Sequence, residues 1–356
     1  LGPAVREVSG PARTVAVISN KTVFTLYGKS AMDSLLSAGF TVKHFLVGDG
    51  ERQKSFPSLE RIVTFLAANG FQRDDVVVAL GGGVVGDLAG FAAAVYLRGV
   101  PLVQVPTTLL AQIDSSVGGK TGINLSSGKN LVGAFHQPAM VLIDPETLRT
   151  LPRRELTSGF CEMVKQGAVG GRKLLDQTVR LMRVGTHSSG VLHAGGKRTD
   201  MAATIAAHCR FKASIVTGDE REDVSRTDPR SRRILNFGHT TAHALEKVTN
   251  YRRFRHGEAV GYGILVAGEL SKSLGMLPPR ELESLREAVA LCGALPRADD
   301  LSPTQIIAAM TADKKVVQGK LKWVLLERIG KPRIVDSAEI KPSILRAALA
   351  AGLRPN

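Results

Sequence analysis

The sequence predicts an α/β N-terminal domain with a parallel, Rossmann-like sheet, followed by a mainly α-helical C-terminal domain. Short Val/Ile-rich runs alternate with helical patterns over the first part of the chain. Long Ala/Leu-rich amphipathic stretches fill the remainder. A chain of 356 residues is long enough for two such domains. We therefore predict domains at residues 1–150 and 151–356.

Five short apolar runs, each bounded by turn residues, predict the strands of the sheet. They are Thr14–Ser19, Thr41–Val47, Val76–Leu80, Leu102–Val105 and Met140–Ile143. A segment with helical periodicity, Leu59–Asn69, lies between the second and third of these runs. Strands that read as nearly continuous apolar runs, with helices between them, indicate βαβ units and a parallel sheet.

Periodic stretches after residue 150 predict the helices of the second domain. They are Leu174–Val184, Thr199–Val216, Thr240–Thr249, Glu258–Leu274, Pro279–Cys292 and Thr304–Thr311. The segment Lys320–Arg328 is hairpin-like and interrupts them late in the chain. We expect Ser225–Arg233 to be an exposed loop, because its Pro and Asp residues break any helix there.

Composition narrows the class of protein. A hydrophobic fraction of 44% argues against intrinsic disorder, and three scattered cysteines argue against a disulfide framework or a cysteine-built zinc site. No signal peptide or membrane span is visible, so we expect a cytoplasmic protein that does not bind membranes. The net charge of +15 allows nucleic-acid binding, but one Trp and four Tyr supply few stacking residues. We expect no nucleic-acid partner.

A glycine-rich segment, Gly81–Asp87, follows the third predicted strand and matches the pattern G-x-G-x-x-G. Glycines there would let a phosphate group approach backbone N–H groups at a helix N-terminus. The acidic residue expected about 20 residues later for the ribose of a dinucleotide is missing from Gly99–Leu109. The segment therefore favours a phosphate-bearing ligand but not an ordinary Rossmann domain, and a tight strand–helix turn is the alternative.

Two lysines, Lys120 and Lys129, lie among Gly, Ser and Thr residues. Such lysines are poor core residues and good anion ligands. The run Gly118–Thr121 resembles the end of a P-loop, but the leading glycine of that motif is missing at the required spacing, so a nucleoside triphosphatase is rejected. A flexible glycine loop with solvated lysines is the alternative interpretation.

Histidines and acids in the second half suggest a metal site without cysteine. His239 and His243 are four residues apart on one predicted helical face, and His256 and Glu258 follow. Two histidines and a carboxylate are the ligand set of many catalytic zinc sites, although any single histidine is more often structural. Earlier in the chain, Glu162 and Lys165 share a helical face, a pattern that by itself is typical of a surface ion pair.

The ordered blocks GGGVVGDLAGF, VPTTLLAQIDSSVGGKTGIN, GFCEMVKQG and LNFGHTTAHALE with HGEAVGYG resemble 3-dehydroquinate synthase, of the sugar-phosphate cyclase superfamily. The resemblance runs from about Asp49 to Lys315. It implies a lyase that uses NAD and Zn²⁺, with Co²⁺ as an alternative metal. The implied reaction converts 3-deoxy-D-arabino-heptulosonate 7-phosphate, an anionic sugar acid phosphate, to 3-dehydroquinate and phosphate in the shikimate pathway. Transient oxidation by NAD, β-elimination, re-reduction, ring opening and aldol closure are implied steps, and a homodimer is the implied assembly.

The resemblance also implies roles for individual residues. The implied metal ligands are Glu162, His239 and His256. The implied NAD contacts are Asp49, Glu51, Lys54, Gly82, Gly83, Val84, Val85, Gly86, Asp87, Thr107, Thr108, Lys120, Lys129, Thr147, Leu148 and Thr150. The implied catalytic and substrate residues are Arg98, Asp114, Lys120, Asn130, Lys165, Lys212, Arg232, Asn236 and His243, with Lys314 or Lys315 closing the pocket.

Two other enzyme activities remain as alternatives. The first is a related cyclase that acts on sedoheptulose 7-phosphate; Lys212, Arg232, Asn236 and His243 together favour dehydroquinate formation instead. The second is a metal- and NAD-dependent dehydrogenase of the glycerol type, which typically has Asp where this chain has Glu162.

Overall fold

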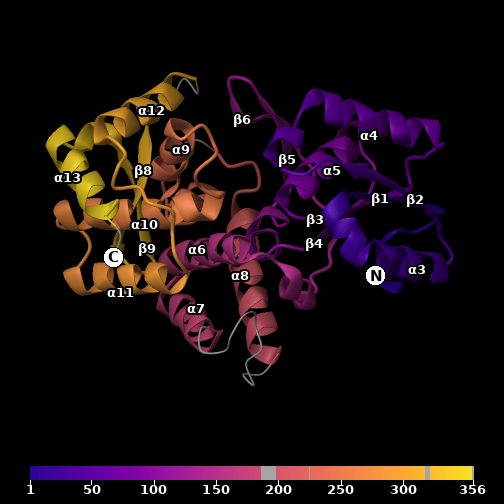
Figure 1. Ribbon diagram of the computed structural model, residues 1–356, viewed down its shortest axis with the longest axis horizontal. Helices are drawn as coiled ribbons and strands as arrows, with labels where there is room; N and C mark the ends of the chain where they lie inside the picture. Colours follow the sequence, from indigo (N-terminus) through magenta and orange to yellow (C-terminus); the bar gives the residue numbers. More distant parts are fainter. Residues whose placement is uncertain (186–197, 224, 317–320, 355–356) are drawn as a thin grey trace. The chain divides into compact units, whose positions relative to one another are not determined.

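The computed structural model describes residues 1–185, 198–223, 225–316 and 321–354 (Figure 1). They form two compact units, Leu1–Leu151 and Pro152–Asn356. The predicted fold class is confirmed, because the first unit contains a parallel sheet between helices and the second is mainly helical. No helix among the described residues is both long enough and apolar enough to cross a membrane.

The five-stranded sheet of the first unit has the order β2-β1-β3-β4-β7, and all its neighbouring strands are parallel. The strands are β1 (Thr14–Asn20), β2 (Thr41–Val47), β3 (Val76–Gly81), β4 (Leu102–Pro106) and β7 (Met140–Val141). Each begins at the predicted residue, and the boundaries differ only at the C-terminal ends. In parallel strands these ends lie at one edge of the sheet, where ligands of open α/β sheets bind.

Helices cover both faces of this sheet, as Figure 1 shows. On one face, α4 (Phe56–Ala68) and α5 (Gly83–Val95) pack against alternate residues of β3 such as Val77. On the other, α1 (Gly2–Val8) and α3 (Lys29–Ser37) pack against Val76 and Val78. Burial on both faces explains why the strands read as apolar runs rather than alternating ones.

A second, two-stranded sheet was not predicted. In it, β5 (Lys120–Leu125) pairs antiparallel with β6 (Gly128–Phe135). A side chain at Gly133 would lie 2.0 Å from the Thr121 carbonyl oxygen, so glycine lets the two backbones meet. The glycines that suggested a loop are therefore required inside a hairpin.

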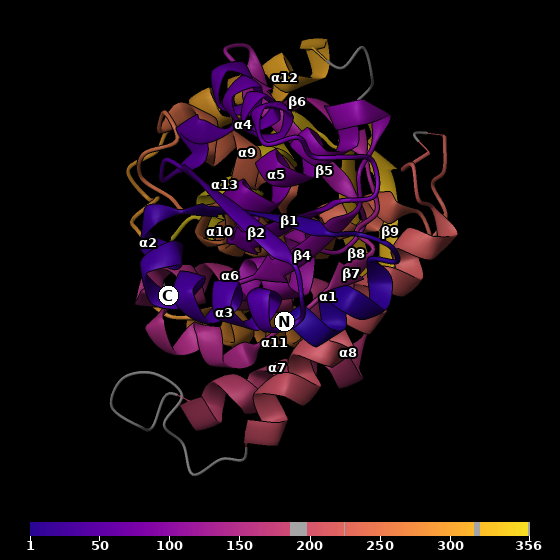
Figure 2. The same cartoon turned by 90° about the vertical axis from the view of Figure 1, so that its right-hand side faces the viewer.

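The second unit is built around α10 (His256–Ser273), whose residues Gly257–Ser271 are all buried. Packed against α10 are α6 (Arg153–Gly170), α9 (His239–Val248), α11 (Pro279–Leu291), α13 (Pro342–Gly352) and β8 (Lys322–Arg328). The remaining elements are α7 (Arg172–Gly185), α8 (Arg198–Gly218), α12 (Pro303–Val316) and β9 (Lys331–Asp336). Helices α7 and α8 lie side by side in Figures 1 and 2. Lys320 lies outside the described residues, and β8 pairs with β9 as the hairpin prediction requires.

Several short helices connect these elements. They are α2 (Lys21–Val23), η1 (Phe24–Gly28), η2 (Glu51–Gln53), η3 (Tyr96–Arg98), η4 (Ala111–Ser115), η5 (Pro145–Thr150), η6 (Arg232–Asn236) and η7 (Ser337–Glu339). Four of them, η2, η3, η4 and η5, together with η6 of the second unit, contain residues to which the sequence assigns a role at the site.

Candidate metal, nucleotide and substrate sites

Three helices of the second unit bring Glu162, His239 and His256 together. Glu162 lies within α6, whereas His239 and His256 are the first residues of α9 and α10. One potential ligand atom from each lies within 4.8 Å of the others. The Oε1 atom of Glu162 is 3.4 Å from Nε2 of His256 and 3.9 Å from Nε2 of His239. These residues are distant in sequence, and folding places them in one cluster.

Glycines beside the two histidines let the helices approach this closely. Gly238 precedes α9 with φ 80°, and a side chain there would lie 2.9 Å from the backbone nitrogen of Ile264 on α10. A side chain at Gly257 would lie 1.9 Å from the carbonyl oxygen of Ser158 on α6. Both contacts involve backbone, which cannot move as a flexible side chain can. The glycines thus hold α9 and α6 against α10.

The ion pair between Glu162 and Lys165 is buried, which corrects the expectation of a surface pair. Their Oε2 and Nζ atoms are 2.7 Å apart, and the side chains are only 1% and 2% exposed. Helix α6 packs against α10 and α7, so the face that carries both residues is covered. A buried carboxylate requires such a partner, because an uncompensated charge in the protein interior is costly.

The imidazole of His239 is held in its neutral form. Burial lowers the pKa of His239 well below its ordinary value, and the positive charges of Lys165, His256 and His243 lower it further. Its Nδ1 lies 3.3 Å from the carbonyl oxygen of Phe237. When Nδ1–H donates to that carbonyl, Nε2 carries the lone pair, and this nitrogen is the one nearest Glu162.

These three side chains fit a metal ion. Neighbouring ligands of a tetrahedral Zn²⁺, each bound at about 2.0–2.1 Å, lie roughly 3.3–3.5 Å apart. The measured separations of 3.4 and 3.9 Å are close to that spacing. Two imidazoles and one carboxylate leave the fourth position for water or a substrate oxygen, as in catalytic zinc sites.

His243, the second histidine of the H-x-x-x-H pair, lies beside this cluster. Its ring centroid is 5.5 Å from that of His239 and 6.0 Å from that of His256. Its side chain is exposed, and a second possible ligand group joins it to Glu246 and His256. Our reading of the sequence did not include Glu246. A carboxylate seven residues after His239 and three after His243 on one helix is a signal that could have identified it.

The predicted cationic residues of this unit lie on three elements that pack together. Lys165 on α6, Lys212 on α8 and Arg232 on η6 are all buried. Arg232 belongs to a stretch that was expected to be an exposed loop, and that expectation is wrong for Ser231 and Arg232. Asn236 is exposed, and its Nδ2 donates to Glu222 at 3.2 Å. The side chains of Lys314 and Lys315 lie outside the described part of the chain.

Asp219 organises the loop that leads to Arg232. Its Oδ1 accepts the backbone N–H of Asp223 and its Oδ2 that of Arg232, each at 2.8 Å. Burial would raise the pKa of Asp219, but these hydrogen bonds and the charge of Arg226 outweigh it, so the pKa is lowered. Within the loop, the Arg226 guanidinium lowers the pKa of Asp228 to about 2.

We expect Asp219→Ala to destabilise the protein by about 1–3 kcal/mol, because it leaves two backbone N–H groups without their acceptor. The pKa of Asp219 is lowered in the folded state, so its contribution is complete above the ordinary carboxyl pKa. That contribution disappears as the pH falls through the folded-state pKa. Urea unfolding at neutral and acidic pH measures this. Asp33→Ala removes an exposed carboxylate and is the control; equal losses from the two variants at neutral pH would contradict the prediction.

In the first unit, many predicted NAD contacts follow the C-terminal ends of the parallel strands. Asp49 follows β2, Gly82 follows β3, Thr107 follows β4 and Thr147 follows β7. Such an edge is where nucleotides bind in open α/β sheets. The Thr107 hydroxyl is buried and makes no hydrogen bond to any described residue. Leu148 and Val85 are buried apolar side chains, so their backbones are what a ligand could reach.

The glycine-rich segment forms a tight strand-to-helix turn. Gly82 precedes α5, and no side chain caps that helix. Side chains at Gly82 and Gly86 would lie 2.9 Å from Thr108 Cγ2 and 2.8 Å from Gln104 Oε1. The tight-turn interpretation is confirmed, because the glycines are needed for packing. The helix N-terminus also offers backbone N–H groups suited to a phosphate, and a phosphate-bearing ligand stays a prediction.

The Lys54 ammonium contacts residues that the family resemblance assigned to different ligands: Glu51 and Asp87 to NAD, and Asn130 to the substrate. Its Nζ donates to Asp87 Oδ2 at 2.6 Å and to Asn130 Oδ1, and lies 3.7 Å from Glu51 Oε1. Burial by itself would lower the pKa of Lys54. The negative charges of Asp87 and Glu51 outweigh the effect of burial, so the pKa is raised. Lys120 and Lys129 lie at the starts of β5 and β6, in the same hairpin as Asn130.

The other predicted residues of this unit lie on short helices. Arg98 is exposed on η3, where Leu97, Arg98 and Gly99 all have positive φ. Asp114 lies on η4 and is half-buried. The Thr147–Thr150 segment forms part of η5. Tyr27 donates to the Thr147 carbonyl oxygen at 3.0 Å and contacts Thr150 Oγ1, two contacts that sequence patterns did not indicate.

Comparison with known proteins agrees with this arrangement. The family models described as 3-dehydroquinate synthase N-terminal and C-terminal match residues 44–158 and 159–316. The chain belongs to the 3-dehydroquinate synthase family. It is 43% identical to the 3-dehydroquinate synthase of Pelotomaculum thermopropionicum over 96% of this chain and 88% of that protein. It is 42% identical to that of Nostoc sp. over 91% of this chain and 86% of that protein.

Solved structures of other enzymes have this fold. A 2-epi-5-epi-valiolone synthase from Streptomyces hygroscopicus, with NAD⁺ and Zn²⁺ bound, has a TM-score of 0.84 at 27% identity and covers 98% of this chain and 94% of its own. A glycerol dehydrogenase from Schizosaccharomyces pombe has a TM-score of 0.62 at 17% identity and covers 96% of this chain and 83% of its own. The second likeness concerns the fold alone. Membership of the synthase family therefore rests on the sequence matches, which are much closer.

Proposed function

We propose that this protein catalyses the 3-dehydroquinate synthase reaction, the conversion of 3-deoxy-D-arabino-heptulosonate 7-phosphate to 3-dehydroquinate and phosphate. This would make it a lyase of the shikimate pathway. The observation that carries the proposal is the convergence of Glu162, His239 and His256 in a chain of this family. The 43% identity to a curated 3-dehydroquinate synthase, against 27% to a valiolone synthase, favours the heptulosonate over sedoheptulose 7-phosphate.

NAD and a divalent metal, Zn²⁺ or Co²⁺, are the proposed cofactors. The valiolone synthase was solved with NAD⁺ and Zn²⁺, and a 2-deoxy-scyllo-inosose synthase of TM-score 0.83 with NAD⁺ and Co²⁺. When bound, NAD would take up and return a hydride, and the metal would polarise the alcohol oxygen involved. Glu162, His239 and His256 would hold the metal, and the N-terminus of α5 with Asp49 and Thr107 would hold NAD.

Buried cations of the second unit would bind the anionic substrate. Lys165, Lys212 and Arg232 are 2%, 6% and 4% exposed, so little water screens their charges. Lysine offers a point charge and arginine a planar fork, which together suit phosphate and carboxylate groups. Arg98, Asp114, Lys120, Asn130, Asn236, His243 and the Lys314–Lys315 pair complete the proposed set.

The ion pair at the metal cluster would prepare Glu162 for binding. The Lys165 ammonium, 2.7 Å from Glu162 Oε2, favours the charged form of that carboxylate, which is the form that binds a metal. The low pKa of His239 likewise leaves its imidazole neutral, as a ligand must be. Both side chains would thus be ready to bind a metal ion.

A phosphate-release assay tests the proposal. We expect the protein, supplied with NAD and Zn²⁺, to release phosphate from the heptulosonate phosphate without accumulating NADH, because the hydride is returned within each turnover. A chelator should abolish the activity, and added Zn²⁺ or Co²⁺ should restore it. Sedoheptulose 7-phosphate, assayed beside it under the same conditions, should release phosphate at most slowly.

Two results would contradict the proposal. Faster phosphate release from sedoheptulose 7-phosphate would assign the protein to the other class of cyclase. NADH accumulation with glycerol or another simple polyol, without phosphate release, would assign it to the metal-dependent dehydrogenases. Each result replaces the proposed activity with one of the alternatives that the sequence left open.

A homodimer in the cytoplasm is the proposed state of the enzyme. This proposal rests on the family resemblance. Sedimentation velocity at micromolar concentration would distinguish a dimer from a monomer. A monomer at every concentration would overturn this part of the proposal.

A further inference from the structure

One imidazole of the metal cluster lies between two carboxylates. The Nε2 atom of His256 is 3.4 Å from Oε1 of Glu162, and its Nδ1 atom is 3.3 Å from Oε2 of Glu246. The two acids lie on different helices, Glu162 on α6 and Glu246 on α9. Both ring nitrogens of His256 therefore face an acidic oxygen.

A histidine that binds a metal through one nitrogen usually donates its other N–H to a carboxylate or carbonyl group. Such a donor bond fixes both the tautomer and the rotation of the ring. In His256 the Nδ1–H would donate to Glu246, which leaves the lone pair on Nε2, beside Glu162. In His239 the corresponding acceptor is the backbone carbonyl of Phe237.

Local structure holds Glu246 in place. Its side chain is 4% exposed near the end of α9. Its carbonyl oxygen accepts the backbone N–H of Tyr251 at 2.7 Å, where the chain leaves the helix. Asn250 and Tyr251 have φ of 51° and 56°, and this turn leads back to His256, ten residues after Glu246. The carboxylate and the ring are thus fixed by one short connection.

We infer that Glu246 is a positioning residue of the metal site, whose carboxylate fixes the tautomer and ring orientation of His256. This inference rests on the proposed function, because it assumes that Glu162, His239 and His256 bind the metal. A second metal bound by His243, Glu246 and His256 is a less favourable arrangement. With both metals present, His256 would have to bind through both nitrogens, which requires a fully deprotonated ring.

The test is metal affinity and the visible spectrum of the Co²⁺-loaded protein. We expect Glu246→Ala to raise the Kd for Zn²⁺ by about 10–100-fold, measured against a competing chromophoric chelator. It should also alter the Co²⁺ absorption bands, which report ligand geometry. Glu246→Gln should recover most of the affinity, because its amide oxygen still accepts the Nδ1–H bond.

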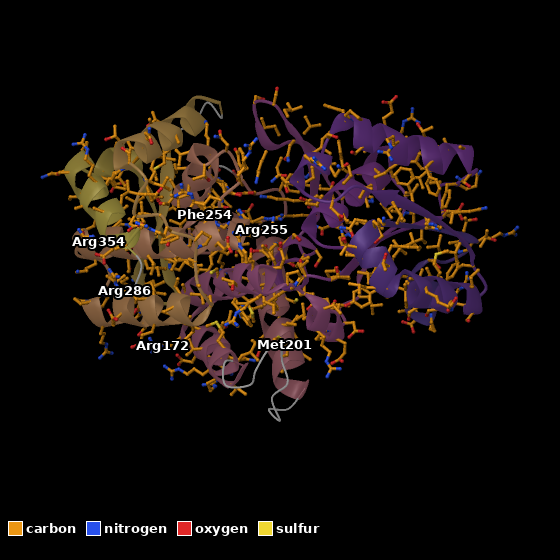
Figure 3. The ribbon with its side chains drawn as sticks, in the orientation of Figure 1. Arg172, Met201, Phe254, Arg255, Arg286 and Arg354 are labelled. Atoms are coloured by element: carbon orange, nitrogen blue, oxygen red, sulfur yellow. The ribbon has the colours of Figure 1, made fainter. Side chains whose placement is uncertain are left out.

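Glu269→Ala is the matched control. Glu269 is a buried carboxylate of the same unit, 7% exposed, and pairs with Arg286 and Lys272. Figure 3 shows Arg286 well separated from Arg255, the residue before His256. Loss of this carboxylate should leave the Kd and the Co²⁺ spectrum unchanged.

Three outcomes would overturn the inference. In the first, Glu246→Ala, or Glu246→Leu if the alanine variant does not fold, binds metal with the Kd and Co²⁺ spectrum of the unchanged protein. In the second, the unchanged protein binds two equivalents of metal and Glu246→Ala binds one. In the third, the unchanged protein binds no metal at all, and the proposed function fails with the inference. Only the third result contradicts both.

Discussion

Glu162→Ala, His239→Ala and His256→Ala should each weaken metal binding by more than about 100-fold. Removing a residue that only hydrogen-bonds to a metal ligand already lowers the metal affinity by about 10–100-fold. Removing a ligand itself should therefore lower the affinity further. Activity at limiting metal should fall to background. Elemental analysis of the purified variants, after dialysis against metal-free buffer, measures the metal content. The loss should be similar for all three, because two donors cannot replace a three-residue ligand set.

His208→Asn is the control for this prediction. His208 is fully buried in the same unit, and its ring nitrogens contact Thr178 Oγ1 and Gln166 Oε1 at 2.9 and 3.0 Å. The change removes a buried imidazole outside the cluster, so stability should fall while metal remains stoichiometric. If Glu162→Ala, His239→Ala and His256→Ala all retained one equivalent of metal, the ligand assignment would be wrong.

Glu162→Ala should also destabilise the metal-free protein, by about 3–5 kcal/mol, because it breaks a buried ion pair and leaves the charge of Lys165 without that carboxylate. His239→Ala should lack this effect, since His239 is a neutral ring. The difference between the two variants in urea unfolding without metal therefore separates the ion pair from metal ligation.

Gly257→Ala should destabilise the protein by about 3 kcal/mol or more and weaken metal binding as well. Replacing a helical glycine by alanine normally stabilises a helix by about 1 kcal/mol. At Gly257 the same replacement should instead destabilise the protein, since the added Cβ would lie 1.9 Å from the Ser158 carbonyl oxygen. The helices α10 and α6 would have to separate, and Glu162 and His256 with them. Thermal unfolding and Zn²⁺ titration measure both effects.

Gly218→Ala is the matched control, because a Cβ at Gly218 meets no atom within 4 Å. This glycine lies at the end of α8 in the same unit, and its replacement should change stability by no more than about 1 kcal/mol. A Gly257→Ala protein as stable as the unchanged one, with normal metal affinity, would show that α6 and α10 do not need this close contact.

The sequence was most informative where a local pattern has one structural meaning. The run Val76–Leu80 reads as apolar because helices cover both faces of β3, and that pattern was enough to predict a buried strand. The hairpin of β5 and β6 was missed because Gly122 and Gly133 serve strand contact there, whereas glycine in a sequence more often marks a loop.

At the candidate metal site, too, sequence patterns indicated only local contacts. Spacing along the chain placed His239 beside His243, and Glu162 beside Lys165, each pair on one helical face. It gave no means to recognise that Glu162 meets His239 and His256, since that contact joins three helices. The contact between Glu246 and His256 could not be predicted from spacing either, because His256 lies beyond the end of the helix that carries Glu246.

By itself the sequence determined the class of fold, the order of the main elements and membership of the family, because these depend on periodicity and on ordered motifs. The tertiary structure decided that the Glu162–Lys165 pair and Arg232 are buried. It also decided that two glycines let the three candidate metal ligands come together and that a second carboxylate contacts His256. Burial and contacts between helices depend on which surfaces pack against one another, and no local pattern of residues records that packing.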